Sequence, residues 1–176
     1  DPKRKDYAIY SGASAITPNR SELSAVTGGM AVKSDTDIEK ACEAVLSSVD
    51  AAAIIATRSE AGISVIERGQ APVHISHEIH EVYDVSGAGD TVIAVLGSVM
   101  AAGGSLVEAA TLANLAGGVA VSRVGTSQVT VNDIQSALDK GFVAADGMQE
   151  KPRSAGAFDE WDAAAMQIRD WQSQGK

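Results

Sequence analysis

The stretch DVSGAGDTVIAVLG, residues 84–97, places two glycines two positions apart, follows them with an aspartate and continues into an apolar run. Gly87 and Gly89 lack a Cβ atom, so the backbone there can turn tightly and approach an anion closely. The apolar run predicts a helix that is buried almost all round. The unpaired N–H groups and the positive dipole end at the start of that helix would stabilise a phosphate. Asp90 would lie beside it, where a carboxylate can accept the proton of an attacking hydroxyl.

A second interpretation of the same residues is structural: a tight strand-to-helix turn, with Asp90 as an ordinary helix-start residue. A Rossmann fingerprint would need glycine at position 92, where the chain has Val92. The Gly-Lys-Ser/Thr sequence of a Walker A loop does not occur. Spacing alone therefore leaves both interpretations open.

The composition limits the classes of partner. A chain of 176 residues is most simply one domain, and with 45% hydrophobic but only 4% aromatic residues its core must consist of Ala, Val, Ile and Leu. A net charge of −9 argues against duplex nucleic acid and anionic membranes as partners. No apolar run reaches membrane-spanning length, and a single cysteine, Cys42, fits a buried helix position and a reducing cytoplasm.

Strands and helices alternate along the chain, which indicates an α/β fold with a mostly parallel sheet. A capping box at Thr36 and Glu39, and another at Ser105 and Glu108, mark two helix starts. A short apolar strand is expected over 51–57, and a β-hairpin over 63–67 and 72–76 that turns at 68–70. Helices are expected over 18–28, 34–48, 91–102, 105–125 and 130–141.

The last part of the chain differs in character. Residues 1–145 form the main region, 146–157 have the composition of a linker, and 158–176 predict an amphipathic helix. Its apolar stripe consists of Phe158, Trp161, Ala165, Ile168 and Trp171. This helix either docks on its own domain or bridges to a neighbouring one.

Three histidines, His74, His77 and His80, lie close together and suggest a metal site. On a strand, however, His77 would point away from the other two. The spacing also lacks the i, i+4 pair of a helical zinc site. The favoured interpretation is therefore that the three histidines are polar residues on a hairpin and its exit loop.

The segment DVSGAGDTVIAVLG closely resembles the second signature of the ribokinase-like (PfkB) carbohydrate kinase family. The resemblance implies a three-layer α/β/α fold with a mostly parallel sheet. It also implies that Gly87, Ala88 and Gly89 line an anion hole and that Asp90 is the catalytic base.

Other segments carry the same resemblance. TPNRSE contains the family's Asn-x-x-Glu element as Asn19 and Glu22, which implies that Glu22 binds Mg²⁺ through water. The alternative for these two residues is an ordinary capping arrangement. Asp84 and the turn at 122–125 match a site for a monovalent cation such as K⁺. The residues expected to bind the nucleotide are Asn19, Arg20, Ser21, Glu22, Thr57, Ser59, Gly62 and Asn114.

Within the family, the segments ITPNRSE, TRSEAGISV and LANLAGGVAVSRVGTSQV are most similar to the kinases that phosphorylate D-glycero-β-D-manno-heptose 7-phosphate at the anomeric hydroxyl for ADP-heptose and lipopolysaccharide core synthesis. This implies ATP and Mg²⁺ as cofactors, a sugar phosphate substrate and a homo-oligomeric parent protein. Many such relatives continue into a nucleotidyltransferase domain with an HxGH-type motif, which this sequence does not contain.

The family's glycine-rich first signature, sugar-contacting residues and β lid do not precede Asp1. The chain thus resembles the C-terminal, ATP-binding half of the kinase, and we expect it to be nearly inactive alone, because positioning of the sugar supplies much of the acceleration. Two alternatives stay open. One is another ribokinase-like kinase acting on ribose, fructose or a similar sugar, and the other is a non-catalytic nucleotide-binding module.

Overall fold

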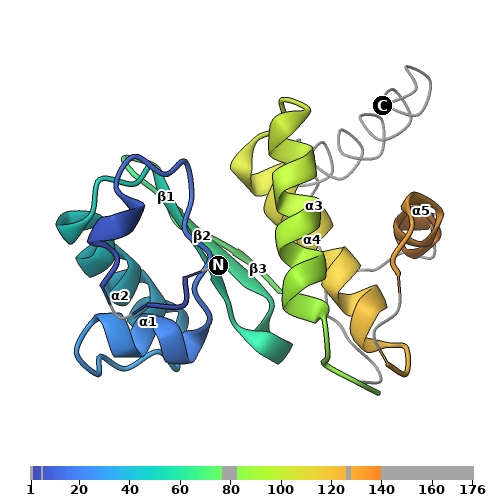
Figure 1. Cartoon of the computed structure of the whole chain (residues 1–176), viewed down its shortest axis with the longest axis horizontal. Helices are drawn as coiled ribbons and strands as arrows, with labels where there is room; N and C mark the ends of the chain where they lie inside the picture. The colour runs from blue at the N-terminus through green and yellow to red at the C-terminus, as the bar shows by residue number, and fades with distance from the viewer. Residues whose placement is uncertain (1, 5, 77–82, 126–127, 140–176) are drawn as a thin grey trace, which may run out of the picture. The chain divides into compact units, whose positions relative to one another are not determined.

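The computed structural model describes residues 2–4, 6–76, 83–125 and 128–139. The chain divides into two compact units, Asp1–His77 and Glu78–Lys176 (Figure 1). The first contains α1, α2 and a sheet of β1 to β3, and the second contains α3, α4 and α5. The expected linker at 146–157 and amphipathic helix at 158–176 lie outside the described residues.

Three strands form the sheet of the first unit: β1 (Ala53–Thr57), β2 (Ile63–Glu67) and β3 (Val73–Ile75). The hairpin of β2 and β3 is confirmed, with Ile63 opposite Ile75 and a turn in which Gly69 has φ +79°. The pairing of these strands differs from the expected mostly parallel sheet, since β1 also pairs antiparallel with β2. Only residues 58–62 connect them, too few for the crossover that parallel strands require. Parallel pairing within the described ranges is limited to two bridges, Ile16 to Ile54 and Asn19 to Thr57.

Two capped helices complete this unit: α1 (Arg20–Val26) and α2 (Asp35–Ser48). The predicted capping box of α2 was wrong by two positions. Ser34 is the N-cap, its side chain accepts the N–H of Asp37, and the Asp37 carboxylate accepts the N–H of Ser34. The sequence SDTD offers two caps two residues apart, and the helix begins at the first.

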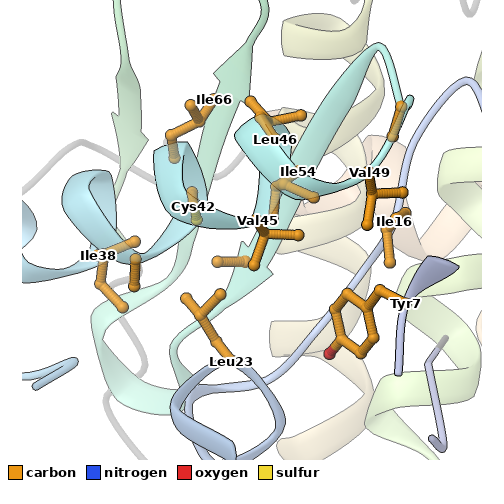
Figure 2. Packing of buried hydrophobic residues seen from close by; sticks show 13 residues of the cluster. Tyr7, Ile16, Leu23, Ile38, Cys42, Val45, Leu46, Val49, Ile54 and Ile66 are labelled. Carbon is orange, nitrogen blue, oxygen red and sulfur yellow. The ribbon is translucent and has the colours of Figure 1, made fainter. Parts of the chain in front are cut away.

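The core of the first unit lies between these helices and one face of the sheet. In α2, Ile38, Cys42 and Val45 recur at helical spacing and lie near Ile54 of β1 and Ile66 of β2 (Figure 2). The predicted burial of Cys42 is confirmed, with its side chain 0% exposed. Burial also raises the pKa of the Cys42 thiol to about 12, because the thiolate would be poorly solvated there.

A buried polar chain joins the hairpin to α2. Ser64 is fully buried on the helix-facing side of β2, and its hydroxyl lies 2.8 Å from His74 Nδ1 on the paired strand. The other ring nitrogen, Nε2, lies 2.9 Å from Glu39 Oε1. His74 is therefore a partnered structural residue, while His77 and His80 lie outside the described residues.

The second unit contains α3 (Ala88–Ala101), α4 (Leu106–Val121) and α5 (Val131–Asp139), with α3 packed along α4 and α4 against α5 (Figure 1). The capping box of Ser105 and Glu108 at the start of α4 is confirmed. At residue 117, a Cβ would meet Val92 Cγ2 at 3.0 Å, so glycine permits the close approach of the two helices.

The expectation that α3 is buried almost all round is wrong. Only Val92, Leu96 and Val99 are buried, on a single stripe at i, i+4 and i+7. Helix α4, by contrast, is mostly buried, as expected. Within the described ranges, none of the helices has both the length and the apolar character that a membrane span needs.

Candidate functional site

The turn before α3 is a tight turn at a glycine. Gly87 is the N-cap of α3 and has φ +80°, a left-handed conformation that favours glycine. Its carbonyl accepts the N–H of Thr91 at 3.0 Å and the Thr91 hydroxyl at 3.1 Å. The chain therefore enters the helix through one tight glycine turn, and Ala88, Gly89 and Asp90 form the first turn of α3.

Open space surrounds Gly89. An ideal Cβ built there would meet no atom within 4 Å, and the backbone conformation is an ordinary helical one. The packing of the described residues thus gives no reason for glycine at position 89. Gly89 and Asp90 are both exposed, so a ligand can approach the N–H groups and the carboxylate together. A bare backbone beside an accessible carboxylate is the arrangement that phosphoryl transfer needs.

Asp84 anchors the entrance to this turn. Its Oδ1 accepts the N–H of Ser86 at 2.9 Å, and its Oδ2 accepts the N–H of Gly125 at 3.1 Å. The hydrogen bonds from Ser86 hold the pKa of the carboxyl below its usual range, with a smaller contribution from Gly125. The carboxylate therefore joins the segment before α3 to the turn after α4.

An ion pair holds the turn after α4 in place. Arg123 donates to the Asp133 carboxylate in α5 and, at 3.1 Å, to the carbonyl of Gln128. Thr130 also donates to Asp133, from its N–H at 2.8 Å and its hydroxyl at 2.6 Å. Arg123 and Thr130 together lower the pKa of Asp133 strongly. The Gly125 N–H that binds Asp84 thus belongs to a well-anchored turn.

The second group of expected site residues gathers in the first unit, where β1 ends and α1 begins. The Thr57 N–H donates to the Pro18 carbonyl at 2.9 Å, and Asn19 pairs with Thr57 in a parallel bridge. Asn19 Oδ1 accepts the Ser21 hydroxyl at 2.7 Å and the Glu22 N–H at 2.9 Å, and Glu22 Oε2 accepts the Asn19 N–H at 2.9 Å. The capping interpretation of Asn19 and Glu22 is therefore realised.

The cap does not use the whole Glu22 carboxylate. Its Oε1 lies 3.7 Å from the Lys3 ammonium, and the side chain is 21% exposed. Within the described part of the chain, no three His, Cys, Asp or Glu side chains group to hold a metal. A single carboxylate oxygen still suits a Mg²⁺ ion that keeps most of its water, so this role of Glu22 stays a prediction.

The turn after β1 has an unusual backbone. Ser59 has φ +55°, the only positive φ of a non-glycine residue among those described, and Gly62 has φ +82°. The Arg58 N–H donates to the Gly62 carbonyl at 2.8 Å, and the Gly62 N–H donates to the Ser59 carbonyl at 3.0 Å. The segment 57–62 is thus a tight loop at the end of β1, as the sequence indicated for Thr57, Ser59 and Gly62.

Sequence reasoning missed two ion pairs at this loop. Arg58, 5% exposed, donates to Asp35 at the start of α2 and, at 2.9 Å, to the Ala61 carbonyl. Arg20 Nη1 lies 3.2 Å from Glu60 Oε1. Arg58 and Glu60 lie close together in the segment TRSE, which indicates ionic contacts. Their partners, Asp35 and Arg20, are 23 and 40 positions away in the sequence.

Asn114 is a buried residue among those expected at the site, as is Gly62. Asn114 is 8% exposed on the largely buried α4, so little of it can reach a nucleotide, and its role in an adenine pocket stays a prediction. The remaining candidates form two groups. The first unit brings together Asn19, Arg20, Ser21, Glu22, Thr57, Ser59 and Gly62. The second brings together Asp84, Gly87, Ala88, Gly89 and Asp90.

Comparison with known proteins identifies similar sequences and folds. The family model for pfkB family carbohydrate kinases matches residues 2–133. The chain is 47% identical over 147 residues, 84% of its length, to the bifunctional protein HldE of Geobacter sulfurreducens. It is 42% identical over 166 residues, 91% of its length, to the bifunctional protein HldE of Vibrio cholerae. It spans only 29% and 34% of these two relatives.

Among solved structures, Arabidopsis thaliana ribokinase complexed with ribose and ATP is similar, with a TM-score of 0.65 and 25% identity. The match covers 70% of this chain and 40% of that one. This likeness confirms the expected ribokinase-like α/β fold, of which the chain covers a part.

Proposed function

Because this chain belongs to the pfkB family of carbohydrate kinases, we propose that it forms the nucleotide-binding side of an enzyme that transfers a phosphoryl group from ATP to a sugar hydroxyl. The observation that carries the proposal is the start of α3. There a left-handed Gly87, an open Gly89 and an exposed Asp90 follow one another within one helical turn.

In this reaction Asp90 is the general base. Its carboxylate takes the proton of the sugar hydroxyl as the hydroxyl oxygen forms a bond to the γ-phosphorus. The bond between the γ-phosphorus and the bridging oxygen breaks, and ADP leaves with that electron pair. The backbone N–H groups of the turn at Gly87 to Gly89 offset the negative charge on the phosphoryl oxygens during transfer.

The residues of the first unit have a separate role in the same proposal. Thr57, Ser59 and Gly62 supply a tight loop for the ATP phosphates, and Asn19 and Ser21 position the start of α1 next to it. Glu22 would hold a hydrated Mg²⁺ through its second carboxylate oxygen. When bound, Mg²⁺ supplies positive charge that offsets the charge of the β- and γ-phosphates.

For the acceptor we propose D-glycero-β-D-manno-heptose 7-phosphate, phosphorylated at C1 to the 1,7-bisphosphate. Two observations support this choice over ribose or fructose. The motifs of 16–22, 57–65 and 112–129 resemble the heptose kinases most, and the identity to the bifunctional relatives extends over most of the chain. The proposed cellular location is the cytoplasm, where ATP is available.

The proposal also includes a bound K⁺ near Asp84. Both oxygens of Asp84 already accept backbone N–H groups, so a cation would have to share them with Ser86 and Gly125. A carboxylate oxygen has two lone pairs, which leaves that sharing chemically reasonable. The homo-oligomeric state expected from the sequence stays a prediction.

Sugar-dependent ADP release tests the proposed function. The complete protein that carries this sequence is assayed with Mg·ATP and heptose 7-phosphate, ribose or fructose, and the 176-residue chain is assayed beside it. We expect rapid turnover with heptose 7-phosphate in the complete protein and almost none in the chain alone. Faster ADP release with ribose or fructose would show that the protein is a kinase of that sugar instead. Nucleotide binding without turnover on any of the three would favour a non-catalytic binding module.

A further inference from the structure

Arg20 and Glu60 form an exposed ion pair at the loop proposed to hold the ATP phosphates. Arg20 Nη1 lies 3.2 Å from Glu60 Oε1, and the two side chains are 30% and 78% exposed. Arg20 follows Asn19, which pairs with Thr57 at the end of β1, and Glu60 follows Ser59 in the loop after it. The pair thus spans the two segments that the proposed function assigns to phosphate binding.

The guanidinium of Arg20 has hydrogen-bonding capacity beyond this contact. It carries five N–H donors, and the hydrogen bond to Glu60 uses one of them. Its Nε is buried and has no hydrogen-bond partner within the described part of the chain. A buried donor without a partner is costly, so a ligand that supplied a second acceptor would be favoured.

Arg58, in the same loop, provides the contrast. Its side chain is 6% exposed, and it holds Asp35 of α2 and the Ala61 carbonyl of its own loop. Because Arg58 is buried and links the loop to α2, it cannot give up these two contacts unless the packing of the turn is lost. Arg20 has a carboxylate partner that is mostly in water, and exposed ion pairs are weak. Asp35, the partner of Arg58, is 57% exposed, but it holds a buried guanidinium, whereas Glu60 at 78% holds one that is itself partly exposed.

We propose that Glu60 is a displaceable counter-ion of Arg20: a phosphate of the bound nucleotide takes over the Arg20 guanidinium, and Glu60 thereby sets the affinity for nucleotides with several phosphates. This role rests on the proposed function, because it assumes that the loop binds a nucleotide. A phosphate carries more charge than a carboxylate and can accept two parallel N–H bonds from a guanidinium, so it wins the exchange. Without a nucleotide, Glu60 keeps Arg20 paired and in place.

Isothermal titration of the 176-residue chain with Mg·ATP, Mg·ADP and adenosine tests this role. Glu60→Gln should tighten Mg·ATP binding about two- to fivefold, the range expected for release of an exposed ion pair. Arg20→Gln should weaken it about tenfold, as for a lost hydrogen bond to a charged group, and Arg20→Lys should recover part of the loss. Adenosine binding should not change in any variant, because it has no phosphate.

The double variant separates direct exchange from simple charge repulsion. With Arg20 replaced by Gln, Glu60→Gln should have less than a twofold effect, because no guanidinium remains to be released. Glu43→Gln is the matched control, since it removes the same charge from an exposed position on α2 and should leave the affinity unchanged. Urea unfolding of each variant shows whether its fold is intact.

The outcomes distinguish a failure of the proposed function from a failure of the proposed role of Glu60. Wild-type chain that fails to bind Mg·ATP overturns the proposed function and this role with it. Nucleotide binding that is unaffected or weakened by Glu60→Gln overturns this role alone. A Glu60→Gln effect that persists in the Arg20→Gln variant also overturns it, because the carboxylate would then act by repulsion at a distance.

Discussion

Asp84 and Gly125 are 41 residues apart in the sequence, yet the Gly125 N–H donates to Asp84 Oδ2 at 3.1 Å. The other oxygen of the same carboxylate accepts the Ser86 N–H, directly before the glycine turn that begins α3. One side chain thus ties the proposed anion hole to the turn that follows α4. The position of the N–H groups proposed to bind phosphate depends on that link.

Asp84→Asn should loosen this link without unfolding the unit. An amide presents one acceptor oxygen and one N–H₂ donor, so one of the two backbone N–H groups loses its acceptor. We expect amide hydrogen exchange at Ser86 or Gly125 to become about tenfold faster or more, the effect of one lost hydrogen bond to a charged group. Unchanged exchange at both amides would show that Asp84 does not anchor the turn. Asp50→Asn, in the other unit, is the control.

The two glycines of the proposed anion hole should respond differently to alanine. At Gly87, with φ +80°, a Cβ is strained, and Gly87→Ala should lower the free energy of unfolding by about 1 kcal/mol or more. At Gly89 the backbone is helical and the space is open, so Gly89→Ala should leave stability within about 0.5 kcal/mol. It should nevertheless weaken Mg·ATP binding about tenfold, because the methyl group blocks approach to the N–H groups. Urea unfolding and calorimetric titration measure the two effects. Full affinity in Gly89→Ala would mean that no phosphate approaches this turn.

Asp133 should make stability depend on pH in the acid range. Its pKa is lowered in the folded protein by Arg123 and Thr130, so the folded state binds the proton less readily than the unfolded chain does. The contribution is fully present above the unfolded value of about 4 and is lost as pH falls toward the folded pKa. The difference in melting temperature between wild type and Asp133→Asn should therefore shrink as pH falls from 7 to 3. A constant difference would contradict the ion pair. Asp139→Asn, in the same helix, is the control.

Cys42 should be unreactive as long as the core of the first unit is folded. Burial raises the pKa of its thiol to about 12, and the thiolate is the reactive form. At pH 8 a disulfide reagent such as DTNB should label the native chain at least about a hundredfold more slowly than the denatured chain. The release of the coloured thiolate measures both rates. Equal rates would show that α2 does not pack on the sheet as described.

Local patterns predicted most elements, because their causes are local. Apolar spacing gave α2, and two short strand segments with a turn at 68–70 between them gave the hairpin of β2 and β3. The cap of α2 was misplaced because Ser34 and Thr36 are chemically equivalent candidates. The burial of α3 was overestimated because hydrophobicity alone cannot tell a half-buried face from a buried one.

The contacts that position the candidate site are mostly non-local, and the sequence could not supply them. Gly87 and Asp90 were predicted from the motif, since glycine spacing and helix starts are properties of neighbouring residues. The partner of Arg20 depends on which distant turns meet, and no periodicity encodes that. The family resemblance alone placed Asp84 with the turn at 122–125, and it did not give the hydrogen bond from the Gly125 N–H. The antiparallel pairing of β1 with β2 depends on a short connection whose turn geometry, with φ +55° at Ser59, is unusual for its residue type.

The role of Asp90 is tested most directly by Asp90→Asn in the complete protein that carries this sequence, with sugar-dependent ADP release and Mg·ATP affinity measured side by side. If the carboxylate is the base, the rate should fall about a hundredfold or more while the dissociation constant for Mg·ATP changes less than about twofold. A variant that still transfers phosphate at the wild-type rate would contradict the assignment of Asp90 as the catalytic base.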